Sequence, residues 1–237
     1  MKQKQWVCLV CGYNMIGSMP DICPFCGAHH DQFLDWEEAE RRYQVQVQRV
    51  NDHVAQLLSV PRLGYEHAAY RIETDSGPVW IDCPSVFNRK LTPPRAIYFT
   101  HLDFMGACNQ YREVWGTRIA LDELDAANPL VTAFPVDYRF RGNFREHDIE
   151  AFPVGGHTPG FTIYIYRTTL FVCDYMMLPA AGGAMQFNQF GNQQHLREGA
   201  TLIARVADER TLETVCGWNY IMGYETWRAA FDKARND

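Results

Sequence analysis

Apolar and polar residues alternate along much of the chain with the period of β-strands. Between residues 43 and 50, Val45 and Val47 alternate with glutamines, which is the pattern of a half-buried strand. Residues 69–81 contain two apolar runs on either side of an Asp-Ser-Gly-Pro segment, a pattern typical of a β-hairpin. Further short apolar runs predict strands at residues 96–100, 161–166 and 170–173.

Helical spacing of apolar residues occurs in three segments. Residues 107–115 have this spacing, and Gly116 is placed to end the helix. The other two predicted helices cover residues 196–208 and 224–235. Because strands first pair as hairpins and then alternate with helices, we expect a layered α/β domain. Residues 179–191, rich in small and amide side chains, predict a mobile loop.

The composition is that of a globular protein with one large and one small domain. The chain has 237 residues, of which 47% are hydrophobic and 21% charged, with a formal net charge of −6. Residues 34–42 are highly charged and contain few apolar residues, which predicts a domain boundary in this segment. We therefore expect one domain at residues 1–38 and another at residues 43–237. Lys and Arg occur singly rather than in a basic patch, so we expect no nucleic-acid partner.

Membrane insertion and secretion are not expected. The sequence has no run of 18 apolar residues, and its first residues lack the apolar stretch of a signal peptide. We therefore expect a cytoplasmic protein. In a reducing compartment, the closely spaced pairs among the eight cysteines indicate metal ligands rather than disulfides.

Four cysteines form two CxxC units near the start of the chain, Cys8 with Cys11 and Cys23 with Cys26. Each unit is followed by glycine, which lets the backbone bend so that amide groups face the sulfur atoms. Four thiolates suit tetrahedral Zn or Fe. A segment this small cannot fold on apolar burial alone, so we expect metal binding to supply much of its stability.

The residues around these cysteines resemble a rubredoxin. Residues 5–36 contain Trp-Val-Cys-Leu-Val-Cys-Gly-Tyr and then Cys-Pro-Phe-Cys-Gly, with the short spacer of the compact rubredoxin module in rubrerythrins. Trp6, Tyr13 and Phe33 stand where that family packs aromatic rings under its iron. The resemblance implies an Fe(Cys)4 centre that changes oxidation state by one electron. A zinc ribbon that only braces the fold is the alternative.

The rest of the chain, from about Val45 to Tyr224, resembles the metallo-β-lactamase fold. This fold is an αββα sandwich that holds one or two metal ions at one edge. The resemblance depends on landmarks in order: an opening hairpin at residues 70–82, a Gly-His-Thr-Pro-Gly loop at 156–160, and Phe-Val-Cys-Asp at 171–174. The resemblance implies an αββα sandwich with a small N-terminal rubredoxin-like domain.

The main metal motif of that family, HxHxDHxG, is only partly kept. Residues 99–106 read Phe-Thr-His-Leu-Asp-Phe-Met-Gly, so His101 and Asp103 remain while Phe99 and Phe104 replace two histidines. Trp218 stands where the family has its last histidine. A two-metal hydrolase centre is therefore disfavoured.

The ligands that remain are His101, Asp103, His157 and Asp174. The resemblance implies that His101, His157 and Asp174 meet at one ion, Fe or Zn, with Asp103 orienting a ligand or a water. Two histidines and one carboxylate are the ligand set of non-haem Fe(II) oxygen chemistry. The alternatives are a metal-free hydrogen-bonded network and an intact dinuclear centre.

Other cysteines and histidines are assigned ordinary roles. Cys173 is expected to point away from its neighbour Asp174, because successive strand residues face opposite sides, and to pack as a small apolar residue. Four histidines lie outside any motif and are expected on the surface or in the core: His53, His67, His147 and His195.

Three functions follow from these patterns. The first is an iron-binding redox protein, an oxidoreductase in which the rubredoxin-like domain passes electrons to a pocket or a single metal ion in the sandwich. The second is a metal-dependent hydrolase. The third is a non-enzymatic binding or assembly factor. The sequence does not identify the electron donor or acceptor, and it leaves a small-molecule ligand and a homodimer open.

Overall fold

The computed structural model describes residues 4–179 and 182–236. Its N-terminal unit is a three-stranded antiparallel sheet in the order β2-β1-β3, followed by a short helix. The Asp35 side chain accepts a hydrogen bond from the Glu38 amide and so begins that helix, within the charged segment at 34–42. The elements of this unit are β1 (Gln5–Cys8), β2 (Asn14–Ile16), η1 (His30–Gln32), β3 (Phe33–Asp35) and α1 (Trp36–Arg42).

A seven-stranded sheet in the order β10-β9-β8-β7-β6-β5-β4 forms the first layer of the larger unit. Strands β4 to β7 are antiparallel to their neighbours, and β7 to β10 are parallel. Its strands are β4 (Gln44–Arg49), β5 (Val54–Val60), β6 (Ala69–Thr74), β7 (Gly77–Ile81), β8 (Ala96–Tyr98), β9 (Arg118–Asp122) and β10 (Tyr138–Phe140).

A six-stranded sheet in the order β11-β12-β13-β14-β17-β18 forms the second layer. Its strands are β11 (Phe144–Glu146), β12 (Ile149–Pro153), β13 (Thr162–Tyr166), β14 (Thr169–Cys173), β17 (Thr214–Gly217) and β18 (Ile221–Gly223). A separate short pair is formed by β15 (Met176–Met177) and β16 (Gln186–Phe187).

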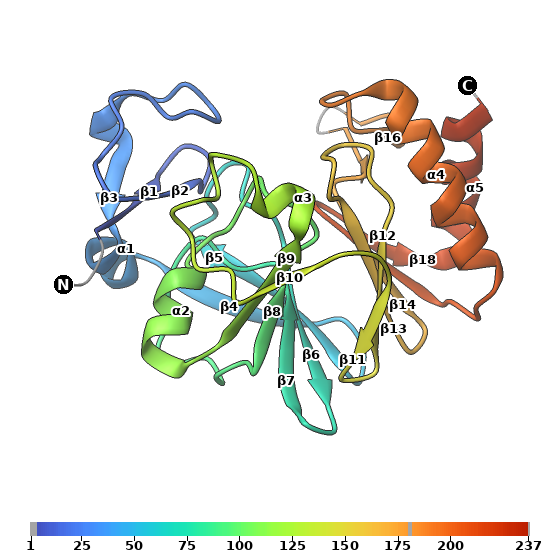
Figure 1. Cartoon of the computed structure of the whole chain (residues 1–237), viewed down its shortest axis with the longest axis horizontal. Helices are drawn as coiled ribbons and strands as arrows, with labels where there is room; N and C mark the ends of the chain where they lie inside the picture. Colours follow the sequence, from blue (N-terminus) through green and yellow to red (C-terminus); the bar gives the residue numbers. More distant parts are fainter. Residues whose placement is uncertain (1–3, 180–181, 237) are drawn as a thin grey trace.

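Helices cover the outer faces of both sheets, as Figure 1 shows for α4 and α5 against the six-stranded sheet. One apolar cluster lies between the sheets and joins Tyr70 and Tyr98 to Tyr164 and Phe171. Two others fill the spaces under the helices, one below α2 and one below α4 and α5. The helices are α2 (Cys108–Trp115), α3 (Glu123–Ala126), α4 (Gln193–Asp208) and α5 (Tyr224–Asn236).

The layers are those of the expected αββα sandwich. The hairpin at 69–81 is confirmed as β6 and β7, and Gly116 ends α2 in the left-handed conformation with φ of 70°. Strand β5 was not predicted, because its buried positions follow no simple alternation. Within the described ranges, no helix has the length and apolar character needed to cross a membrane.

The N-terminal unit packs directly on the sandwich. Phe104 of the sandwich lies in one apolar cluster with Cys8, Cys11 and Cys23. Beside it, the fully buried Gln5 side chain donates to the Gly106 carbonyl at 3.1 Å. The two units are therefore in contact through both apolar side chains and a buried hydrogen bond.

Two candidate metal centres

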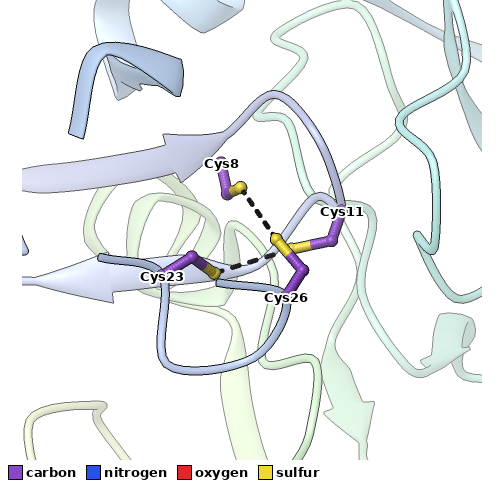
Figure 2. Close-up of side chains that lie close together, drawn as sticks. All are labelled: Cys8, Cys11, Cys23 and Cys26. Carbon is purple, nitrogen blue, oxygen red and sulfur yellow. Dashed lines mark hydrogen bonds between the residues drawn. The ribbon is translucent and has the colours of Figure 1, made fainter. Parts of the chain in front are cut away.

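The four N-terminal cysteine side chains point toward one another (Figure 2). The sulfur of Cys8 lies 3.7 Å from that of Cys26, and the sulfur of Cys11 lies 3.8 Å from that of Cys23. A tetrahedral ion with metal–sulfur bonds of about 2.3 Å requires sulfur–sulfur distances of about 3.8 Å. The geometry of the cluster therefore fits one tetrahedral thiolate-bound ion.

Two matching backbone turns position these sulfurs. In the first, the Gly12 amide donates to the Cys8 carbonyl at 2.8 Å, and in the second the Gly27 amide donates to the Cys23 carbonyl at 3.0 Å. Both glycines have positive φ, 85° and 75°, which glycine adopts without strain. The glycine after each CxxC unit is thus required by the turn.

The cysteine cluster is shielded on its inner side. Cys8, Cys11 and Cys23 are buried, whereas Cys26 is partly exposed. The hydrogen bond from Cys11 lowers the pKa of the Cys8 thiol, whereas the same hydrogen bond raises the pKa of Cys11 and burial raises that of Cys23. Thiolate is therefore favoured at Cys8, and a bound ion would be needed to deprotonate Cys11 and Cys23. Tyr13 is also buried against this cluster.

The second candidate centre lies at the ends of strands from both sheets. His101 follows β8, His157 follows β12, and Asp174 follows β14. Asp174 lies 3.5 Å from the Nε2 atoms of both histidines, through Oδ1 to His101 and Oδ2 to His157. Asp103 Oδ2 lies 2.9 Å from His157 Nε2 and 3.7 Å from His101 Nε2. The fold therefore brings the four residues expected from the sequence together.

The ring orientation of each histidine is fixed through its other nitrogen. The Thr100 hydroxyl donates to the Asp82 carboxylate at 3.0 Å, so it accepts from His101 Nδ1 at 2.9 Å. The carbonyl of Phe190 accepts from His157 Nδ1 at 3.1 Å. Both Nε2 atoms are thereby turned toward Asp174, as is usual for metal-binding histidines.

Asp125 ties the two histidine-bearing loops together. One of its oxygens accepts from the Leu102 amide and from the Thr158 hydroxyl, and the other accepts from the Gly160 amide at 2.8 Å. Its side chain is fully buried. The loop after β8 and the loop after β12 are therefore held at a fixed separation.

The protonation states suit metal binding. Burial lowers the pKa of His101 well below its usual value, so this imidazole is neutral. Burial also lowers the pKa of His157, but the hydrogen bond to Asp103 and the charge of Asp174 outweigh it and raise this pKa to about 9. Burial raises the pKa of Asp174 to about 6. Without metal, the proton on His157 therefore balances the carboxylates, and a divalent ion would displace it.

Two buried atoms test whether a metal fits here. Among the described residues, eight buried side-chain polar atoms lack a hydrogen-bond partner, and two of them, His101 Nε2 and Asp174 Oδ1, lie 3.5 Å apart in this site. Buried polar atoms normally have partners, so this pair indicates a missing group between them. Ligand atoms on one ion with bonds of about 2.1 Å lie about 3.0–3.5 Å apart, which matches most of the distances around Asp174. The residues present fit a bound divalent cation.

Some residues lie elsewhere than expected. Cys173 does not point away from the site, because a register shift and a φ of 42° turn the end of β14, and its sulfur lies 3.5 Å from His67 Nδ1. His67 was not expected in the site, but its side chain is buried there. The one sequence signal for this position is that His67 lies just before strand β6. Phe99 packs in the core beneath α2.

The loop expected at residues 179–191 contributes to the second centre. Its buried residue Asn188 donates a hydrogen bond to Asp174 at 2.9 Å. Residues 180–181 of this loop lie outside the described residues.

A family model matches the N-terminal unit. Residues 6–34 match the rubredoxin-like domain of rubrerythrin. The comparison with curated proteins gave no match. The cysteine cluster is thus a metal-binding site of rubredoxin type, in agreement with its geometry.

Solved structures resemble the larger unit. The DIM-1 metallo-β-lactamase is 11% identical with a TM-score of 0.60, over 81% of this chain and 98% of that one. The FIM-1 metallo-β-lactamase from Pseudomonas aeruginosa, in its mono-zinc form, is 13% identical with a TM-score of 0.60. The match covers 92% of this chain and 98% of that one. The metal-soaked Flv1 flavodiiron core from Synechocystis sp. PCC6803 is 10% identical with a TM-score of 0.61, over 82% of this chain and 61% of that one. The chain therefore joins a rubredoxin-like domain of the rubrerythrin type to a domain with the metallo-β-lactamase fold.

Proposed function

We propose that this chain is an iron-binding redox protein whose rubredoxin-like unit passes electrons, one at a time, to its own sandwich pocket. The receiving group in the pocket is a ligand or a single metal ion held by His101, His157 and Asp174. This assigns Cys8, Cys11, Cys23 and Cys26 to iron, and makes the protein an oxidoreductase of a reducing compartment, the cytoplasm. Iron bound by four thiolates supplies one-electron chemistry.

The contact made by Phe104 is the observation that carries this proposal. Its ring shares a buried cluster with Cys8, Cys11 and Cys23, and lies 4.6 Å from the ring of Phe25, which stands within the second CxxC unit. The Phe104 ring also lies 4.1 Å from the ring of His67, which is buried in the second candidate centre. A single side chain thus packs against both candidate centres.

This arrangement favours transfer within one chain. Electron transfer slows steeply with distance, so centres joined by packed side chains exchange electrons faster than centres separated by solvent. Phe104 is buried, and Phe161 stacks on the ring of His101 at a centroid distance of 5.0 Å. These two rings make the inner side of the site apolar, which strengthens the electrostatic interactions of His101 and its neighbours, while Asp103 remains 22% exposed.

The test is purification of the full chain from cells grown with ample iron. We expect a red protein whose visible absorption bleaches on addition of dithionite, with iron found by elemental analysis. One iron atom per chain would indicate that the electrons pass to a molecule bound in the sandwich domain. Two iron atoms per chain would indicate that they pass to a metal ion in that domain. Colourless protein that contains only zinc under these conditions would overturn the redox function, and esterase or thioesterase turnover by that protein would support a hydrolase instead.

A further inference from the structure

His67 lies at the second candidate centre although no metal motif includes it. Its side chain is 6% exposed, and its Nε2 lies 3.8 Å from Asp174 Oδ2. Its ring centroid is 5.1 Å from that of His101. His67, His101 and Cys173 form one group whose possible ligand atoms all lie within 4.8 Å of one another.

The three histidines around Asp174 share one orientation. In each ring, Nδ1 is in contact with a group of the chain: the Thr100 hydroxyl for His101, the Phe190 carbonyl for His157, and the Cys173 sulfur for His67. In each ring, Nε2 is then directed toward the Asp174 carboxylate, at 3.5, 3.5 and 3.8 Å. Fixing one imidazole nitrogen so that the other is presented to an ion is how proteins orient metal-binding histidines.

The segment that carries His67 is held by two of the residues that replaced family histidines. The Phe104 ring packs against the His67 ring at 4.1 Å. The indole Nε1 of Trp218 donates to the carbonyl of Glu66, the preceding residue, at 3.1 Å. The Glu66 side chain is itself buried and accepts from the Ser59 and Ser85 amides. The replacements thus position a different imidazole beside Asp174.

We propose that His67 is a metal ligand, which binds through Nε2 and takes over from the histidines absent at positions 104 and 218. This inference rests on the metal-ion version of the proposed function. The cation is iron, which imidazole and carboxylate ligands bind and which can change between Fe³⁺ and Fe²⁺ as it receives an electron. Zn²⁺ binds the same donors and serves as the redox-inert probe in the test. Cys173 holds the His67 ring by accepting from Nδ1, and Asp174 faces all three imidazoles.

The experiment titrates Zn²⁺ into the full chain whose cysteine site already holds iron, in competition with a chromophoric chelator. His67→Gln, which keeps a side chain of similar size, is compared with wild type and with His195→Gln, which changes an exposed histidine on α4. Loss of groups that only orient a ligand weakens metal binding by about 10–100-fold, so loss of the ligand itself is expected to weaken it by about 100-fold or more. X-ray absorption at the zinc edge should find one imidazole fewer in His67→Gln.

The visible spectrum of the cysteine-bound iron reports whether each variant is folded and is expected to stay unchanged. Equal zinc affinity and equal imidazole number in His67→Gln and wild type would overturn the assignment of His67. The assignment also fails if wild type binds no ion beyond the cysteine site. Both of these results leave the iron spectrum and its bleaching in place, so they are distinct from failure of the redox function itself.

Discussion

Asp125 shows how one buried carboxylate can set the geometry of a site that it does not enter. Its two oxygens serve three donors on two loops, one carrying His101 and the other His157. Burial raises its pKa to about 6, against the hydrogen bonds from Thr158 and Gly160, which favour the charged form. The separation of the two imidazoles therefore depends on the hydrogen bonds of this side chain.

Asp125→Asn is expected to loosen both loops. Whichever oxygen becomes an amide group, at least one donor loses its acceptor, at a cost of about 1.5–3 kcal/mol for a hydrogen bond to a charged group. We expect a melting temperature lower by several degrees and Zn²⁺ affinity in the sandwich weaker by about 10–100-fold. Asp148→Asn, at an exposed ion pair with Arg145, is the control and should change neither. Unchanged zinc affinity in Asp125→Asn would contradict the positioning role.

His157→Ala separates the two candidate centres. The substitution removes an imidazole that lies 2.9 Å from Asp103 and 3.5 Å from Asp174, so the sandwich is expected to lose its metal. The absorption of the cysteine-bound iron should remain, because His157 has no part in that cluster. Elemental analysis and visible spectra of the same preparation check both results. Loss of both signals together would mean that the two centres are not independent.

Residues differ in how far the sequence could predict them. The cysteine quartet follows from spacing within two short turns, so Cys8 and its partners are predictable from local sequence. His101 and His157 follow from family landmarks. His67 does not, because its role arises from packing against Phe104 and Trp218, which are distant in sequence. Cys173 is buried in an apolar cluster as predicted, but the predicted direction of its side chain is wrong, because the alternation rule fails where a strand shifts register.

At the scale of elements, the first CxxC turn and the loop between β5 and β6 fit together backbone to backbone. A Cβ atom on Gly64 would lie 2.2 Å from the Val10 carbonyl oxygen. In the same turn, a Cβ atom on Gly12 would lie 2.6 Å from the side-chain hydroxyl of Ser85, which follows β7. The hairpin, the strands at 44–49, 96–98, 162–166 and 169–173, and three helices were predictable from apolar periodicity, whereas β9 to β12 and β15 to β18 were not. This contact was not, because it depends on the close approach of two irregular segments.

Gly64→Ala is expected to weaken the attachment of the N-terminal unit. The added methyl group would meet backbone, which cannot move aside as a flexible side chain can. Overpacking of this kind costs about 1–3 kcal/mol, and urea should therefore release the cysteine-bound iron at lower concentration than in wild type. Gly223→Ala, where the nearest atom is 4.0 Å away, is the matched control. Equal midpoints for wild type and Gly64→Ala would show that the contact does not hold the unit in place.

At the scale of the molecule, the candidate centres of the two units both contact Phe104, through the cysteine cluster and through His67. The sequence predicted both units, but it left open whether they face each other or act between chains. The buried position of Gln5 and the apolar cluster around Phe104 join them within a single chain. Electron transfer through this contact is therefore expected to be first order and independent of protein concentration.

Phe104→Leu tests this route in the chain loaded with iron at both centres. After flash reduction, we expect the reduced cysteine-bound iron to be reoxidised several-fold more slowly than in wild type, because the ring contacts to Phe25 and His67 are lost. Tyr138→Leu, which changes an exposed ring on β10, is the control and should leave the rate unchanged. A rate that rises with protein concentration would indicate transfer between chains instead.

The burial of Phe104 also determines how the protein can be divided for experiments. Phe104 is 3% exposed in the whole chain, and its neighbours Tyr13 and Phe25 both belong to the N-terminal unit. A truncated chain that begins at β4 would therefore expose this ring to solvent and leave the His67 segment without its outer support. A sandwich prepared alone should therefore bind metal less tightly than the intact chain.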